Sequence, residues 1–376
     1  MKRLHYLHLI AALLLIGGMT SCNDDNGTPT IETVETLSGL YVINNGNMAA
    51  NIPSSITSYD SFTGSSTPAL QDAFKTANGV PLGEGAQQAL IYGSKMYIPM
   101  HDSNLIWVVN KQTLKIEDYI RPEGEASGPR SLAAADGKVY ASMFSGYVAK
   151  IDTVTLKIEK TLKTGPNSDQ VAIANGKLYV ANSDGYNYDG GYADCSISVI
   201  DLASFSESKI KDISKVLNPT DLATNGKEVF VICKGDYGEV PSTVKKIVGN
   251  DVVDVALGNY MAVNEDKLYV INSPYGIPRK DMGFDVYSTI TLKKEGEIIR
   301  QTEGSESWIE SPSGIFADPI SGDIVILSYT LSEAGYSQYK EPCYANIYDT
   351  KGNFIKRIEC GIGALGVTFV HKTQLK

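Results

Sequence analysis

The chain has 376 residues, with 33 Lys and Arg against 43 Asp and Glu and a formal charge of −10 at neutral pH. This balance argues against nucleic acid as a partner, because phosphate binding needs a basic surface. Of the four histidines, His5 and His8 fall within an expected leader, so a histidine metal site or a Ser-His-Asp triad has only His101 and His371 to draw on.

The first residues have the pattern of a secretory leader. Lys2 and Arg3 precede an apolar run at positions 9–16, which is too short to span a bilayer as a helix and is followed by small residues. We therefore predict a signal peptide over residues 1–21 that takes no part in the fold.

The next residues predict a membrane anchor. Residues 19–22 (MTSC) resemble the bacterial lipobox, so cleavage would leave Cys22 as a lipidated N-terminus; the alternative is a plain cysteine beside a conventional cleavage site. Residues 23–25 (NDD) resemble the acidic surface-export signal of Bacteroidetes lipoproteins. We expect residues 22–36 to form the tether and the body to lie on the cell surface, lipid-anchored to the outer membrane.

A short apolar strand carrying an aromatic or branched residue then recurs along the rest of the chain. The copies usually follow a glycine and a lysine or similar polar residue, as in GKVYAS and GKLYVAN. Spacings of roughly 40 to 55 residues suit the four-stranded blades of a β-propeller. The aromatic or branched position falls at Tyr41, Tyr97, Tyr140, Tyr179, Phe230, Tyr269 and Val325.

Each repeat reads as four antiparallel strands, seen best over residues 169–212, where apolar residues alternate with polar ones. Asn175-Gly176 and Asp136-Gly137 suit tight hairpin turns. Residues 363–370 resemble a first strand without a second, and residues 40–44 a second strand without a first. The sequence therefore predicts an all-β, seven-bladed propeller over residues 37–372, in which the C-terminal strand completes the first blade and removes the exposed edges.

The recurring position of the aromatic residues within the repeat separates core from surface. We expect Tyr97, Tyr140, Tyr179, Tyr269 and also Trp107 to be core residues. Among the cysteines after Cys22, Cys343 and Cys360 are expected on adjacent strands and predicted to form a disulfide, whereas Cys195 and Cys233 are expected to be half-buried thiols.

One propeller face is predicted to bind. The loops between second and third strands open on the same face as the links between blades, and they are the longer and more varied loops. They combine tyrosine with Asn, Ser, Gly and Asp, a composition typical of recognition surfaces. The alternative for any single tyrosine is packing between loops, and for His101 it is a solvated loop position. The candidate ligand-binding residues are Asn45, Asn47, His101, Asp102, Arg130, Phe144, Asn167, Tyr186, Tyr188, Tyr192, Asp236, Tyr237, Tyr275, Trp308 and Tyr329.

The lipobox, the acidic export signal and the seven units with a G-K-x-Tyr-Val strand together resemble the Bacteroidetes propeller lipoproteins of the BtuG type, within the wider YncE-like propellers. The resemblance covers about 37–371. It implies non-covalent capture of cobalamin or a related corrinoid at the cell surface and delivery to a BtuB-type outer-membrane transporter, with no catalytic residue, no catalytic cofactor and no metal, and with a body that is monomeric apart from the transporter.

Two other functions remain open from the residues. A surface glycan-binding lipoprotein would use the same tyrosines as stacking platforms for sugars. A propeller lyase or oxidoreductase would need an acid–base pair or a metal cluster at the channel mouth.

Overall fold

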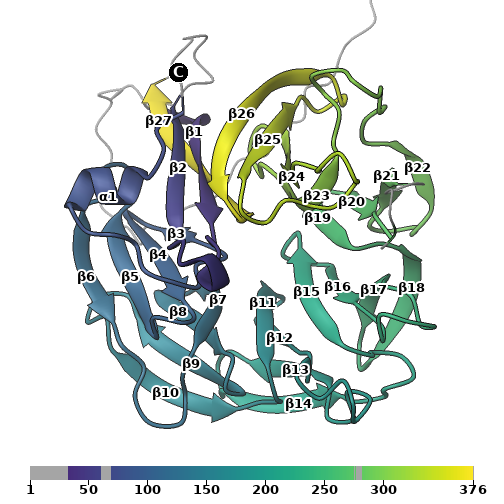
Figure 1. The fold of residues 1–376 in the computed structure, drawn as a ribbon. Coiled ribbons are helices and arrows are strands. Elements are labelled where there is room, and N and C mark those ends of the chain that lie inside the picture. The colour runs from purple at the N-terminus through teal and green to yellow at the C-terminus, as the bar shows by residue number, and fades with distance from the viewer. Residues whose placement is uncertain (1–32, 61–68, 275, 277–281, 376) are drawn as a thin grey trace, which may run out of the picture.

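The strands form seven sheets arranged around a ring, as Figure 1 shows in the computed structural model. The structure describes residues 33–60, 69–274, 276 and 282–375. The predicted leader at 1–21, the predicted lipidation site Cys22, most of the predicted tether at 22–36 and the candidate residue Tyr275 lie outside these residues. The predicted fold class, a seven-bladed β-propeller, is confirmed.

Six blades are four-stranded antiparallel sheets whose strands follow one another along the chain. Their inner strands lie near the ring centre and their outer strands at the rim (Figure 1). The second to fourth blades comprise β3 (Leu90–Tyr92), β4 (Lys95–Met100), β5 (Leu105–Asn110) and β6 (Ile116–Ile120); β7 (Pro129–Ala135), β8 (Lys138–Met143), β9 (Tyr147–Asp152) and β10 (Ile158–Lys163); and β11 (Ser168–Ala174), β12 (Lys177–Asn182), β13 (Ser196–Asp201) and β14 (Ser206–Ile210).

The fifth to seventh blades repeat this order around the ring. They comprise β15 (Pro219–Thr224), β16 (Val229–Cys233), β17 (Thr243–Val248) and β18 (Asp251–Leu257); β19 (Tyr260–Asn264), β20 (Lys267–Asn272), β21 (Gly283–Ser288) and β22 (Lys294–Glu297); and β23 (Ser311–Ala317), β24 (Ile324–Tyr329), β25 (Pro342–Tyr348) and β26 (Phe354–Ile362).

The first blade joins the two ends of the described chain. β1 (Thr33–Asn44) pairs antiparallel with β2 (Ser55–Asp60) on one side and with β27 (Ala364–Leu375) on the other. At the outer edge of β2, Ser58 and Leu70 exchange backbone hydrogen bonds of 2.9 and 2.8 Å, so within the described residues a single bridge takes the fourth-strand position. The predicted closure by the C-terminal strand is confirmed.

The repeat aromatics lock neighbouring blades together, as predicted. Tyr97 and Tyr140 are almost fully buried. The Tyr41 hydroxyl crosses from the first blade to donate to the Lys111 carbonyl of the second at 3.0 Å. Because hydrophobic clusters span pairs of blades rather than single sheets, each blade is stabilised mainly by its neighbours.

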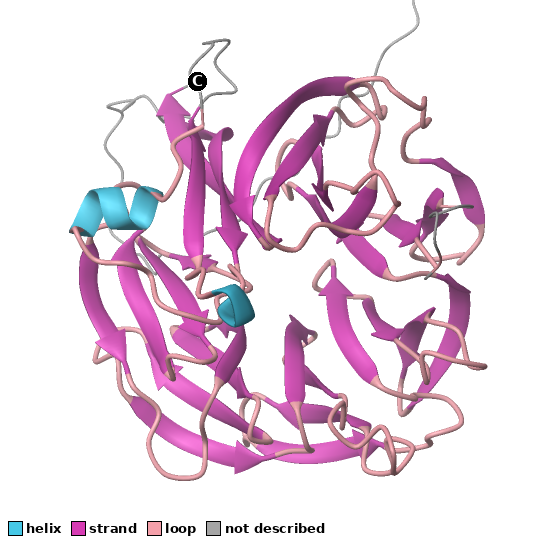
Figure 2. Cartoon of the chain, viewed as in Figure 1, coloured by secondary structure: helices cyan, strands magenta, loops and turns pink. Residues whose placement is uncertain are grey.

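Two short helical segments interrupt the strands of the described chain, shown in cyan in Figure 2. They are α1 (Ala73–Asn78) and the 3-10 turn η1 (Met48–Ala50). Phe74 of α1 is fully buried and lies 5.7 Å from the ring of Trp107, which explains why this short segment stays helical without an amphipathic repeat. No helix in the described ranges is long and apolar enough to cross a membrane.

The cysteines differ from the predictions. Cys343 on β25 and Cys360 on β26 do lie on adjacent strands, but both are free thiols and the predicted disulfide is absent from the structure. A β-bulge between Pro342 and Tyr344 shifts the register at Cys343, and its sulfur accepts from the Ala364 amide at 3.5 Å instead. Cys195 and Cys233 are fully buried rather than half-buried.

Candidate functional site

The inner strands of the ring enclose a cavity of about 480 Å³ at the mouth of the central channel. Residues from β7, β11, β15, β19, β23 and β27 line it, as does the link that precedes β3. We call it the channel mouth. Its polar lining residues are Gln87, Gln88, Arg130, Ser131, Asp169, Gln170, Thr220, Asp221, Lys234, Tyr237, Tyr260 and Ser313.

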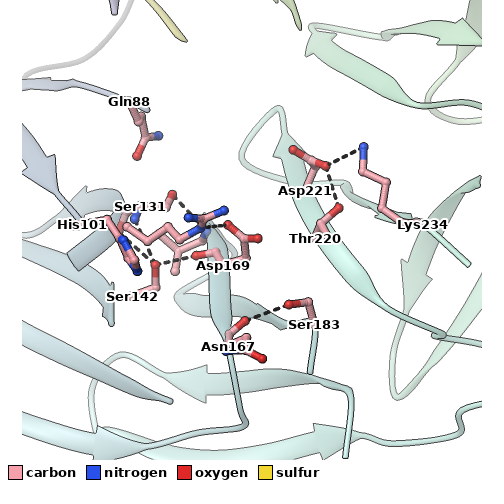
Figure 3. A network of polar contacts seen from close by, with 12 residues as sticks. Gln88, His101, Ser131, Ser142, Asn167, Asp169, Ser183, Thr220, Asp221 and Lys234 are labelled. Atoms are coloured by element: carbon pink, nitrogen blue, oxygen red, sulfur yellow. Dashed lines mark hydrogen bonds and ion pairs between the residues drawn. The ribbon is translucent and has the colours of Figure 1, made fainter. Parts of the chain in front are cut away.

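An ion pair between two neighbouring blades forms one part of this lining. The Arg130 Nε lies 2.6 Å from Asp169 Oδ1, and both side chains are largely buried, at 21% and 16% exposed. Burial raises the pKa of Asp169 above its ordinary value, and the Arg130 guanidinium only partly opposes that rise. Figure 3 shows Asp169 within this network beside Ser142, whose hydroxyl donates to the Asp169 carbonyl.

A second ion pair lies on the next blade along. Lys234 Nζ is 3.4 Å from Asp221 Oδ2 and donates to the Asn259 carbonyl at 2.7 Å. The Thr220 hydroxyl donates to the same Asp221 oxygen at 2.7 Å (Figure 3). Burial lowers the pKa of Lys234, but the Asp221 carboxylate outweighs it and holds the pKa above its ordinary value. With both cations paired, the channel mouth presents donors and acceptors side by side instead of one net charge.

An aromatic cluster borders the channel mouth. The Phe144 ring lies 5.0 Å from His101 and 5.2 Å from Tyr186, edge to face in both cases. The Arg130 guanidinium lies 4.7 Å from the Phe144 centroid, a cation–π contact. Asn167 Oδ1 accepts from the Tyr186 amide at 3.2 Å, and His101 Nδ1 lies 2.8 Å from Asp102 Oδ1.

Glycine is required beneath this cluster. Gly128 has φ +68°, and a Cβ at this position would lie 3.1 Å from His101 Cδ2 and 3.4 Å from Phe144 Cβ. The structure therefore brings together six of the candidate residues, which come from three different blades: His101, Asp102, Arg130, Phe144, Asn167 and Tyr186.

Other candidates gather across the ring in a smaller cluster. Asn47 Nδ2 donates to the Tyr339 carbonyl at 2.9 Å, and the Tyr339 ring lies 4.9 Å from Tyr329. Tyr329 is partly buried, which raises its hydroxyl pKa. The buried Asn45 Oδ1 accepts no hydrogen bond from any described residue.

The candidate tyrosines of the loops differ in exposure. Tyr186, Tyr188 and Tyr237 are 75%, 66% and 77% exposed, and Tyr237 also lines the channel mouth. Tyr192 is 4% exposed, and Tyr237 and Asp236 of the next blade's loop act electrostatically on it, which agrees with the alternative of packing between loops.

Two candidates have evident structural partners. The Asp236 carboxylate caps a turn by accepting from the Gly238 and Val240 amides, each at 2.8 Å. Trp308 does not line the channel mouth; its carbonyl accepts from the Tyr344 hydroxyl at 3.2 Å.

Sequence reasoning missed the acidic partners of the channel mouth. Asp169 and Asp221 each follow a proline by two or three positions, at the start of an inner strand. Each comes directly after a hydroxyl residue, Ser168 or Thr220. That recurrence is a signal that could have found them, because equivalent inner-strand positions of neighbouring blades converge on one channel. In the described part of the chain, no group of three or more His, Cys, Asp or Glu side chains is placed to hold a metal ion.

Comparisons with known proteins support the fold. The sequence matches no protein-family model and no curated protein. Among solved structures it is similar to a hydrazine synthase of Kuenenia stuttgartiensis, at 13% identity and a TM-score of 0.56 over 84% of this chain and 99% of that chain. It is also similar to U3-55K (12%, TM-score 0.54, 75% and 84% covered) and to the WD40 repeats of RRP9 (11%, TM-score 0.53, 75% and 83% covered). At these identities the likeness shows a β-propeller fold alone.

Proposed function

We propose that this protein is a surface-exposed, lipid-anchored binding protein that captures cobalamin or a related corrinoid on this face without a chemical step. The observation that carries the proposal is the channel mouth of paired charges. The exposed ring of Tyr237 lines it, and the exposed ring of Tyr186 borders it through Phe144 and Arg130. Delivery to an outer-membrane transporter of the BtuB type is part of the proposal. Its support is the sequence resemblance together with the lipobox and the acidic export signal.

The chemistry of the face suits such a ligand. Exposed tyrosines offer large flat contact areas at low entropy cost, and a corrinoid is a large flat ring. The ring is fringed with amides, each of which carries a donor and an acceptor. The pairs Arg130–Asp169 and Lys234–Asp221 present donors and acceptors side by side. Such a surface complements an amide, which has both a donor and an acceptor, better than it complements an anionic or a cationic ligand.

The proposal is tested by titrating the purified protein with cyanocobalamin, followed by gel filtration with detection at the corrinoid absorbance. We expect saturable binding and co-elution at micromolar concentration. Absence of co-elution would reject corrinoid capture while leaving the fold untouched.

A glycan is the second candidate, favoured by the exposure of two further tyrosines. Tyr336 and Tyr339 are 58% and 56% exposed, and sugars stack on such rings. Titration of the same protein with neutral oligosaccharides distinguishes the two, since saturable glycan binding without cyanocobalamin binding would replace the first proposal.

The double substitution Tyr186→Ala with Tyr188→Ala is expected to weaken cyanocobalamin binding by about tenfold or more, because anchoring aromatics dominate binding energy. Both rings are mostly exposed, so the ring of blades should fold normally. The matched control is Tyr119→Ala, a 52% exposed tyrosine on the outer strand β6. Calorimetric titration measures the difference, and equal affinity in the double variant and wild type would place the ligand elsewhere on the face.

A further inference from the structure

A second cavity of about 480 Å³ lies between the third and fourth blades, where residues 193–196 form part of its lining. The β8–β9 loop contributes Ser145 and Gly146, and the link after β10 contributes Thr164, Gly165 and Pro166. Ala193 to Ser196 contribute the end of the loop that also carries Tyr186 and Tyr188. It shares no lining residue with the channel mouth, so it is a separate site.

The charge of this cavity differs from that of the whole chain. Lys163, Lys209 and Lys211 all line it, although the chain carries a formal charge of −10. Against them stand the lining carboxylate of Asp194 and the carboxylate of Glu207, which lies 3.5 Å from Lys209 Nζ. Lys163 and Lys211 form no ion pair with any described residue, whereas the two cations of the channel mouth are paired. A local excess of positive charge in a concave site attracts anions.

Lys209 is held in place within the cavity. Its Nζ donates to the Thr164 carbonyl at 2.8 Å and lies 3.5 Å from Glu207, and its side chain is only 21% exposed. Lys209 therefore provides a fixed ammonium group, and the exposed Lys163 and Lys211 can close on a ligand from the rim.

The hydroxyl groups of the cavity already have partners. The Thr164 hydroxyl bonds Ser168 at 2.8 Å, and Ser196 accepts from Asn182 at 3.2 Å. The ammonium groups carry the charge that distinguishes this cavity. Lysine acts as a compact point charge and is a frequent ligand of phosphate groups.

We propose that this cavity binds the phosphate group of a small molecule, independently of the corrinoid proposal. Lys163, Lys209 and Lys211 neutralise the phosphate, and the volume leaves room for the organic part that bears it.

The test is calorimetric titration of the full-length protein with inorganic pyrophosphate, chosen as a small phosphate probe. Wild type should bind it saturably, more weakly as salt increases. The double variant Lys163→Gln with Lys211→Gln should weaken binding by about tenfold, since each exposed charge contributes modestly. The matched control is the double variant Lys157→Gln with Lys160→Gln. Lys160 lies on β10, as Lys163 does, and Lys157 directly precedes this strand; both are exposed, and neither lines the cavity.

The same variants provide the results that would overturn the proposal. An equal loss in the control pair would mean that overall charge, not this cavity, attracts the probe. Absence of saturable binding by wild type would reject the site. Binding of wild type to phosphatidylglycerol vesicles but not to pyrophosphate would replace a small phosphate ligand with a lipid surface.

Discussion

Replacing Arg130 with methionine is expected to lower the free energy of unfolding by about 3 kcal/mol at neutral pH, because loss of one partner leaves a buried charge without compensation. Asp169 is the group left behind: only 16% of its side chain is exposed, and its 2.6 Å contact with Arg130 Nε is lost. Methionine retains much of the apolar volume beside Phe144, so the effect reports charge more than packing. Urea unfolding followed by tryptophan fluorescence measures it.

The pH dependence of this loss has a definite sign. The pKa of Asp169 lies above its ordinary value because burial outweighs the help of Arg130. The Asp169 carboxyl group therefore binds a proton more readily in the folded protein than in the unfolded chain. Its contribution to the free energy of unfolding falls as the pH rises through the raised pKa. Without Arg130 the pKa rises further, so the deficit of the variant should be largest at neutral pH and shrink on acidification.

A double variant separates charge from shape. Arg130→Met combined with Asp169→Asn should recover most of the lost stability, because no charge is then buried alone. A deficit in Arg130→Met that stays constant with pH and persists in the double variant would show that the guanidinium matters only through its packing.

The substitution His371→Ala is expected to cost about 2 kcal/mol of stability at neutral pH, less than for a fully buried pair because His371 is 18% exposed. His371 Nε2 lies 2.6 Å from Oδ1 of Asp318, whose side chain is fully buried. The bond joins the closing strand β27 to the turn after β23 in the seventh blade. Its loss weakens the contact between the first and last blades, which thermal unfolding would detect.

Acid should abolish the difference between wild type and His371→Ala. Burial opposes ionisation of Asp318, but hydrogen bonds from His371 and Ser321 outweigh it and hold the carboxyl pKa below its ordinary value. A lowered pKa in the folded state gives stability that is present above the unfolded value and lost as pH falls through the folded one. The stability difference between the two proteins should therefore shrink as the pH falls through the lowered pKa of Asp318.

His101→Ala serves as the control for this pair. His101 and Asp102 also form a short contact, but their side chains are 21% and 33% exposed on a loop. We expect this change to cost less than about 1 kcal/mol. If His101→Ala lost as much stability as His371→Ala, any His–Asp contact would matter equally. The contact at the ring closure would then have no special importance.

The fold was predictable because its signal is repeated and local. Strand alternation around Tyr97, Tyr140 and Tyr179 recurs with the same turns, and an unpaired strand at each end implies closure. α1 was missed because a six-residue helix has no period of its own and depends on burial of Phe74. The prediction of a Cys343–Cys360 disulfide was wrong. The two residues lie on adjacent strands, but a β-bulge shifts the register at Cys343, and strand adjacency alone does not determine which residues face each other.

The candidate site was only partly accessible to sequence reasoning. The face and its exposed Tyr186 follow from loop length and composition. Tyr192, six positions later, has the same composition around it, but its side chain is buried and its backbone has φ +58°. The sequence pattern predicts neither feature. The Arg130–Asp169 pair joins residues 39 positions apart on different blades, so it depends on how inner strands converge rather than on any local motif.

The pairing of β1 with β27 also fixes the order in which the molecule can be completed. The Ser38 hydroxyl donates at 2.9 Å to the carbonyl of Val370, a residue 332 positions later. Among the described strands, β1 is synthesised first and β27 last. The inner edge of β1 therefore has no partner until β27 has been synthesised. Contacts of such long range form slowly, so the unfinished ring is the state most exposed to aggregation and proteolysis.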